Sequence, residues 1–140
     1  MSQLQDKNGI FETGGTEFTL VLKDGNKVIF SSKKRGLRPL LECLVEWSGR
    51  VDNASLTDKV VGRAAARLIV RSKIIGTVTA GLISRGALKY LSDHSIPVKW
   101  REKTDVILRG DGHGICPMEE LSNRFPDDID FYLAVIDFFK

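Results

Sequence analysis

The chain has 140 residues, of which 42% are hydrophobic and 28% charged, and 21 basic against 18 acidic residues leave a net charge of +3. This composition excludes a disordered chain and suits one globular domain with its own core. No apolar run approaches the ~20 residues of a membrane-spanning helix, and the start of the chain lacks the features of a secretory signal. We therefore expect a cytoplasmic protein with no membrane partner, and the small net charge argues against nucleic acid as a partner.

The first half of the sequence predicts a tail, a hairpin and a helix. Residues 1–15 are polar and rich in glycine, which predicts a disordered tail. Two β-rich runs flank Asp24-Gly25, and this dipeptide is typical of a hairpin turn. In residues 37–47, "LRPLLECLVEW", the leucines recur with the helical period, so a helix follows the hairpin.

The clearest predicted helix is "LTDKVVGRAAARLIVRSK", residues 56–73, in which Thr57 or Asp58 is the expected cap. Gly62 then lies one turn inside this helix, which indicates close approach of another backbone or a ligand. A buried strand at 74–84 follows, and then a helix that starts at Ser84.

The remainder predicts one or two short strands within 97–110 and helical segments opened by Pro117 and Pro126. Strands that alternate with helices imply a mostly parallel sheet, here with an antiparallel hairpin at its start. The expected fold is therefore an α/β protein, a three-layer α/β/α sandwich. Residues 16–125 form its domain, and residues 126–140 form a helical extension that packs on the domain or on a partner as a homodimer surface.

Four segments carry a resemblance to a known family: "GLRPLLE", "DKVVGRAAA", "SRGAL" and "CPMEEL". Through them the chain, from about Phe18 to Leu121, resembles an uncharacterised bacterial and archaeal family placed in the cytidine-deaminase-like superfamily. The resemblance implies a mixed sheet that opens with a β-hairpin, and a pocket at the carboxyl ends of the strands. It implies no particular reaction.

Zinc deaminases use His-x-Glu at one helix start and Pro-Cys-x-x-Cys at the next, which supply three zinc ligands and a glutamate that transfers protons. At the places that we match to these motifs, this chain has Asp58-Lys59-Val60 and Ser84-Arg85-Gly86-Ala87. Serine and alanine do not replace two thiolates as zinc ligands. We therefore expect no zinc-dependent deamination, no metal and no cofactor.

Two helix starts that meet at one sheet edge would favour an anion, because their N–H groups and dipoles point into the same space. The alternative is that the same residues serve only as helix caps and packing points. The expected ligand-binding residues are Asp58, Lys59, Gly62, Ser84, Arg85, Gly86, Arg109 and Asp111. The basic run "SSKKRGLR", residues 31–38, is either plain surface or a contact for a phosphorylated ligand or RNA, and the absence of interleaved tryptophans argues against RNA.

The stretch "RGDGHGICPMEEL", residues 109–121, places Cys116 before Pro117 as the expected N-cap of a helix. A thiol at that position is a candidate nucleophile, with His113 as its base and Asp111 orienting the imidazole. Two alternatives remain open: a turn with a semi-buried cap, or a metal site made by these three residues. Cys43 falls on the apolar side of its helix and is expected in the core.

Together these patterns predict a binding protein of deaminase-like fold for a small anionic, nucleotide-like ligand. An enzyme that uses Cys116 as a nucleophile or redox thiol is one alternative. A structural or partner-binding domain that works through its C-terminal helix is the other.

Overall fold

The computed structural model describes residues 12–13 and 16–140. Apart from Glu12–Thr13 (β1), the tail expected over residues 1–15 lies outside the described residues; β1 pairs with Thr16–Glu17 (β2). The remaining elements, in chain order, are β3 (Leu20–Asp24), β4 (Lys27–Ser32), α1 (Arg38–Trp47), β5 (Ala54–Val61), α2 (Arg63–Ser72), β6 (Ile75–Ser84), α3 (Arg85–Asp93), β7 (Val98–Thr104), α4 (Pro117–Arg124) and α5 (Asp128–Phe138).

Five strands form one open, mixed sheet in the order β4-β3-β5-β6-β7. β3 pairs antiparallel with β4 and with β5, whereas β5, β6 and β7 run parallel to one another. The hairpin turns at Gly25, whose φ of +62° is one that glycine adopts without strain. The predicted α/β class, the antiparallel hairpin and the parallel strands after it are confirmed.

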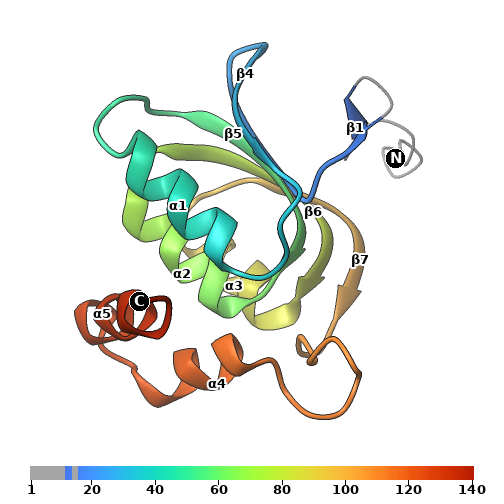
Figure 1. Ribbon diagram of the computed structural model, residues 1–140, viewed down its shortest axis with the longest axis vertical. Helices are drawn as coiled ribbons and strands as arrows, with labels where there is room; N and C mark the ends of the chain where they lie inside the picture. Colours follow the sequence, from blue (N-terminus) through green and yellow to red (C-terminus); the bar gives the residue numbers. More distant parts are fainter. Residues whose placement is uncertain (1–11, 14–15) are drawn as a thin grey trace.

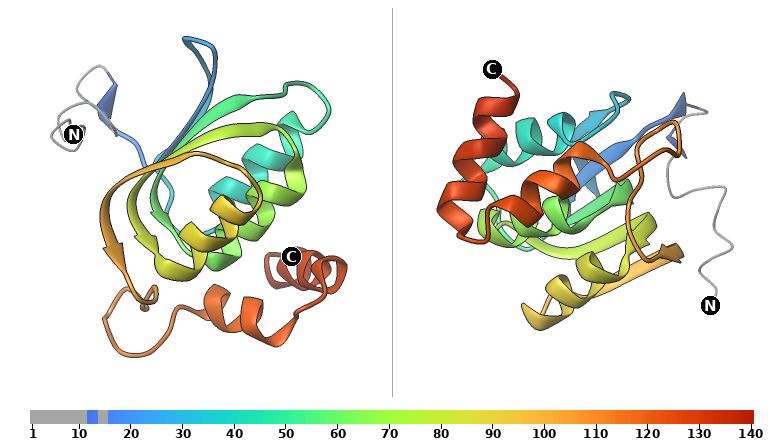
Figure 2. Two further views of the ribbon diagram at one scale, coloured as in Figure 1. Left: turned by 180° about the vertical axis from the view of Figure 1, so that it is seen from behind. Right: turned by 90° about the horizontal axis from the view of Figure 1, so that it is seen from below.

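The predicted three-layer sandwich is wrong, because α1, α2 and α3 all lie on the concave face of the curved sheet (Figures 1 and 2). The cause is the strand order: β5, β6 and β7 advance across the sheet in one direction, and right-handed crossovers then place α2 and α3 on the same face. α4 contacts α2, and α5 contacts α4, so these two helices add to the same side.

The predicted helix at residues 56–73 is wrong in its first third. Residues Ala54–Val61 form β5, and α2 begins at Arg63 with Gly62 as its N-cap. Neither Thr57 nor Asp58 is therefore a helix cap, and Gly62 does not lie inside the helix. The β-branched residues of this segment suit a strand, and β5 completes the sheet by pairing with both β3 and β6.

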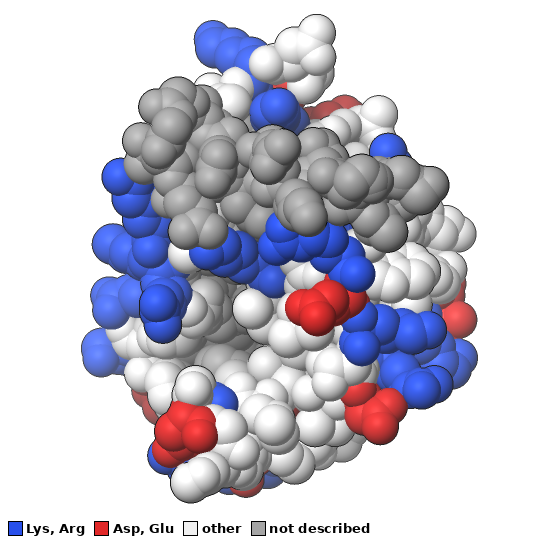
Figure 3. Space-filling view, turned by 90° about the vertical axis from the view of Figure 1, so that its right-hand side faces the viewer, with Lys and Arg blue, Asp and Glu red and all other residues white. Residues whose placement is uncertain are grey.

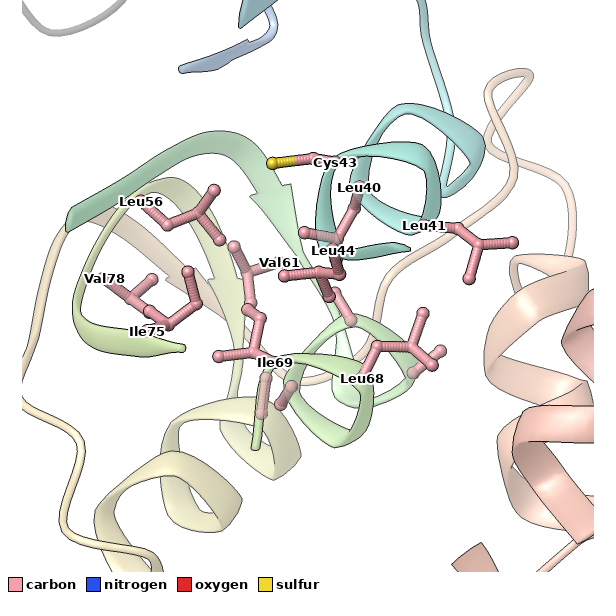
Figure 4. Close-up of a cluster of buried hydrophobic side chains, with 14 of the residues drawn as sticks. Leu40, Leu41, Cys43, Leu44, Leu56, Val61, Leu68, Ile69, Ile75 and Val78 are labelled. Atoms are coloured by element: carbon pink, nitrogen blue, oxygen red, sulfur yellow. The ribbon is translucent and has the colours of Figure 1, made fainter. Parts of the chain in front are cut away.

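The core lies between the sheet and the helices α1, α2 and α3. Leu40 and Leu44 from α1 face Leu56 on β5 and Ile69 on α2 in this core (Figure 4). Cys43 is completely buried there, as its position on the apolar side of the helix predicts. The three alanines at residues 64–66 are buried as well, and their small side chains let α2 approach its neighbours closely.

The C-terminal helix packs on the domain through one face. Phe131 and Val135 of α5 are buried, and the guanidinium carbon of Arg67 lies 4.1 Å from the centre of the Phe131 ring. Ile129 and Leu133 remain 61% and 58% exposed on the other face. Residues 126–140 therefore contact the rest of the chain through one face of α5, and a partner surface for this segment stays a prediction. No helix among the described residues is long and apolar enough to cross a bilayer.

Candidate functional site

A cavity of about 390 Å³ opens at the carboxyl end of β5, beside the N-termini of α1, α2 and α4. Its lining residues are Thr19, Leu20, Lys34, Arg35, Gly36, Leu37, Pro39, Asp58, Lys59, Val60, Gly62, Ala64, Ala65, Ile107, Cys116, Met118 and Glu119. Figure 3 shows one side of the molecule, on which lysine and arginine side chains outnumber the acidic ones. The carboxyl edge of the parallel strands is the usual position of ligand sites in open α/β sheets.

Asp58 supplies the most perturbed carboxyl group at this cavity. Burial raises its pKa to about 7 from the ordinary 3.8, although hydrogen bonds from the backbone at Val60 and Lys59 pull in the opposite direction. Burial also raises the pKa of the nearby Cys43 thiol to about 12, with smaller contributions from the charges of Glu46 and Asp58. Asp58 is therefore a carboxyl group that exchanges its proton near neutral pH at the wall of a cavity.

Basic side chains line the cavity on the connection between β4 and α1. Lys34 and Arg35 are exposed there, and the Lys34 amino group lies 4.0 Å from a Glu42 carboxylate oxygen. The Thr19 hydroxyl fixes this connection by donating to the Lys34 carbonyl at 2.6 Å. Of the basic residues in the run at residues 31–38, Lys34 and Arg35 are the two that line the cavity. Lys59 adds a third basic residue to its lining.

The N-terminus of α2, where an anion was expected, holds a carboxylate of the chain itself. Glu119 on α4 accepts hydrogen bonds from the backbone N–H groups of Arg63 and Ala64, both at 2.9 Å. Gly62 makes room for this contact, since a Cβ atom at that position would come within 2.6 Å of Glu119 Oε2. Gly62 is thus closely approached, but by a side chain from a distant segment and not by the backbone or ligand that the sequence predicts.

Cys116 lines the cavity and is the N-cap residue of α4, with Pro117 in the first turn, as the sequence predicts. Its thiol makes no capping hydrogen bond; its backbone carbonyl accepts from the N–H groups of Glu119 and Glu120 at 2.9 and 3.1 Å. Cys116 is therefore a half-buried, free cysteine in the wall of the cavity.

The glycine-rich stretch before Cys116 forms a hairpin-like loop. Leu108 bridges to Ile115, and the Arg109 N–H donates to the Gly114 carbonyl at 2.9 Å. Gly112 and Gly114 have φ values of +78° and +97°, which explains the choice of glycine at these turns. The loop is thus an ordered turn that leads into α4.

His113 and Asp111 do not form the expected pair with Cys116. Both are exposed and lie outside the cavity lining, as does Arg109. The Asp111 carboxylate accepts from the backbone N–H of His113 at 2.8 Å, not from the imidazole ring. Among the described residues, no group of three or more His, Cys, Asp or Glu side chains could hold a metal ion.

The second predicted helix start also lies outside the cavity lining. The Ser84 hydroxyl is buried and accepts from the Ala87 N–H at 3.1 Å, so it caps α3. Arg85 pairs with the exposed Asp105 at 2.6 Å, and Gly86 packs near Arg63. Of the eight predicted ligand-binding residues, the structure brings Asp58, Lys59 and Gly62 together and leaves the other five outside.

The sequence analysis does not predict the role of Glu119. The one signal for it was Gly62, whose missing side chain indicates a close neighbour. Met118, buried against the cavity, was missed as well because a methionine after a proline carries no distinctive pattern.

A family model described as TM1506, domain of unknown function (DUF1893), matches residues 10–139. The fold is also similar to the crystal structure, at 2.70 Å resolution, of a DUF1893 family protein, TM1506, from Thermotoga maritima. The two chains share 28% sequence identity with a TM-score of 0.79, over 96% of this chain and 88% of that chain. No curated protein matches the chain.

Proposed function

The chain belongs to the DUF1893 family, and from this premise we propose that it binds a small anionic, nucleotide-like ligand in the cavity at the carboxyl end of β5. The family is described as a domain of unknown function, so the support for a ligand comes from the cavity. Sites of this kind are concave, mostly apolar and supplied with a few polar groups that orient the ligand.

One observation carries the proposal: the cavity combines three kinds of surface that match the parts of a nucleotide. Lys34 and Arg35 offer positive charge to a phosphate at the rim. Leu37 and Met118 offer apolar contact to a flat ring. Asp58 offers a carboxyl group that accepts a hydrogen bond when ionised and donates one when protonated, as recognition of a base edge requires.

We also propose that the fold is deaminase-like without zinc chemistry. Its support is the hairpin followed by three parallel strands joined by helices, in the order β4-β3-β5-β6-β7. Asp58, which the sequence analysis matches to the first zinc motif, lies inside β5. The zinc ligands of a deaminase would therefore have to come from the residues at the helix starts. These read Leu37-Arg38-Pro39 for α1, Gly62-Arg63-Ala64 for α2 and Ser84-Arg85-Gly86 for α3, without histidine or cysteine.

Cys116 supports a second candidate function, in which the same cavity carries covalent or redox chemistry. The supporting observation is that the Cys116 thiol lines the cavity and makes no capping bond. A base for it would come from the ligand or from Asp58, because His113 lies outside the cavity lining. We rank this candidate second because no described side chain is bonded to the thiol.

The test is calorimetric titration with adenosine monophosphate, cytidine monophosphate, adenosine and inorganic phosphate. We expect a monophosphate to bind more tightly than adenosine. Replacing Lys34 and Arg35 by alanine together should weaken monophosphate binding about tenfold or more, because charge-assisted hydrogen bonds are lost.

The matched control is Lys23→Ala with Lys27→Ala, which removes the same charge from the exposed β3–β4 hairpin. Equal weakening in both double variants would mean that the charge acts only at long range. No binding of any of the four compounds at millimolar concentration would contradict the proposal.

A further inference from the structure

Helix α4 forms one wall of the cavity, and its N-terminal end is held by a contact that spans 56 positions of sequence. Cys116, Met118 and Glu119 line the cavity from this helix. Glu119 binds the backbone N–H groups of Arg63 and Ala64 at the start of α2. A carboxylate at a helix N-terminus gains from both hydrogen bonds and the helix dipole, so this contact holds the wall in place.

The other end of α4 is held by a different and more deeply buried contact. Arg67 is only 5% exposed, and its Nη1 donates to the Ser122 carbonyl at 2.9 Å and to the Ser122 hydroxyl at 3.2 Å. Its Nη2 donates to the Pro126 carbonyl at 3.1 Å. The two ends of α4 are thus held differently. A buried arginine holds the C-terminal end through hydrogen bonds, whereas the end at the cavity is held by the half-buried Glu119 and by the side chain of Met118, which is 7% exposed.

The connection from β7 to α4 contributes few buried contacts that would fix the N-terminal end of α4. Within residues 105–115 only Ile107 is buried, and Val106, Leu108 and Ile115 are 45%, 50% and 39% exposed. Segments with few buried apolar contacts open at a low free-energy cost compared with the core. This long connection is seen at the lower edge of the molecule in Figure 1.

We propose that α4 is a lid on the cavity, closed by the Glu119 carboxylate on the N-terminus of α2 and hinged where Arg67 holds Ser122. Opening breaks the two Glu119 hydrogen bonds and moves Cys116 and Met118 away from the cavity, while the Arg67 contacts persist. When it opens, the lid gives access to the cavity in which we propose that the ligand binds. The biological role of the lid therefore rests on the proposed function.

The two cysteines of the chain make the lid testable without any ligand. Cys116 lies on the lid, whereas Cys43 is completely buried in α1 and reacts only when the domain itself opens. The experiment measures the alkylation rate of each thiol by iodoacetamide, followed by mass spectrometry of the peptides. We expect Glu119→Ala to accelerate Cys116 about fivefold or more and to leave Cys43 unchanged, because exchange through an open form follows its population.

The matched control is Glu120→Ala, which removes the same group one position further along α4 from an exposed residue. A second variant, Gly62→Ala, disturbs the contact from the other side, because the new Cβ would displace the Glu119 carboxylate. Its backbone, with φ −96° and ψ −177°, accepts alanine without strain. We expect Gly62→Ala to accelerate Cys116 as Glu119→Ala does, and the double variant to add little further.

Equal Cys116 rates in Glu119→Ala and Glu120→Ala would overturn the lid, as would parallel acceleration of Cys43, which indicates opening of the whole domain. Neither result depends on a ligand. A failure of the nucleotide titration therefore leaves the lid standing, and a failure of the alkylation test leaves the ligand proposal standing.

Discussion

At the scale of single residues, the burial of the Asp58 carboxyl group lowers the stability of the fold and gives the cavity a group that titrates near neutral pH. A carboxyl group removed from water favours its neutral form, and the pKa of about 7 expresses that preference. Proteins keep such groups mostly where a ligand or a reaction makes use of them. Because Asp58 lines the cavity together with basic residues, its replacement tests both the stability of the fold and the binding of a ligand.

The raised pKa of Asp58 predicts how the free energy of unfolding depends on pH. Below pH 4 the group is protonated in both the folded and the unfolded chain, so it contributes nothing. Between pH 4 and 7 the unfolded chain has released the proton that the folded chain still holds, so stability falls as the pH rises. Above pH 7 the loss is complete, on the order of a few kcal/mol.

Asp58→Asn should remove most of this decline, since the amide stays neutral and its oxygen still accepts the backbone hydrogen bonds. The measurement is urea unfolding of the wild type and the variant at pH 5 and pH 8. Asp24→Asn on the exposed hairpin is the control and should keep the decline of the wild type. A decline of the same size in Asp58→Asn would show that another group causes it.

Asp58 and Gly62 were predicted as site residues from the sequence, but for a partly mistaken reason. Both were taken as parts of one helix, whereas Asp58 lies on β5 and Gly62 caps α2. They remain at the cavity because Asp58 lies in the carboxyl-terminal half of β5 and Gly62 directly follows that strand. The contact of Glu119 could not be predicted from the sequence, because no local pattern relates this residue to a segment 55 positions away.

At the scale of elements, the misplaced start of α2 shows how a local pattern is overridden by pairing. "LTDK" ahead of three alanines is a good helix start by capping and propensity alone. The same residues pair with β3 on one side and β6 on the other, so in the described sheet β5 joins the hairpin to the parallel strands β6 and β7. Pairing with two neighbours outweighs a capping preference of about 1 kcal/mol.

The elements α2, α4 and α5 are joined through one side chain, that of Arg67. Besides its bonds to Ser122 and Pro126, it pairs with Asp128 at 2.9 Å and lies on the ring of Phe131. The Asp128 carboxylate is 63% exposed, so its share of the ion pair is screened by water. The backbone carbonyls that Arg67 satisfies are the larger contribution, because they would otherwise be left without a partner.

Arg67→Lys should lower the free energy of unfolding by about 2–4 kcal/mol, because one ammonium group does not reach partners on both helices. Urea unfolding measures the change. Arg71→Lys is the matched control: Arg71 lies one turn further along α2, over the Tyr132 ring, and the substitution should cost well under 1 kcal/mol. Equal losses in the two variants would contradict the role assigned to Arg67.

At the scale of the whole molecule, the sequence predicts the elements better than their arrangement. The run in β6 is apolar enough to suggest helices on both sides, but Thr77 and Thr79 alternate with the core residues Val78 and Ala80. Thr77 donates a hydrogen bond to Ser55 on the neighbouring strand. Which face the helices cover depends on the order of the strands, and periodicity along the chain carries no information about that order.

The same limit applies to residues 126–140, whose sequence suits either a partner surface or a helix packed on its own domain. In the structure Phe131 is 2% exposed and its ring lies 4.1 Å from the guanidinium carbon of Arg67, so this side chain packs against α2. Deleting residues 126–140 should therefore lower the thermal midpoint by on the order of 10 °C, through the loss of a buried aromatic ring and the exposure of a buried arginine. Thermal unfolding followed by circular dichroism measures this shift.

The control for that deletion uses the opposite face of the same helix. Ile129→Ser with Leu133→Ser changes only exposed positions, so it should shift the midpoint by no more than a few degrees. If the truncated chain keeps the midpoint of the full chain, α5 does not stabilise the domain and its packed face is free to serve a partner. Replacing exposed apolar side chains by serine changes stability little. A large fall of the thermal midpoint in the serine variant would therefore mean that this outer face of α5 is covered in solution.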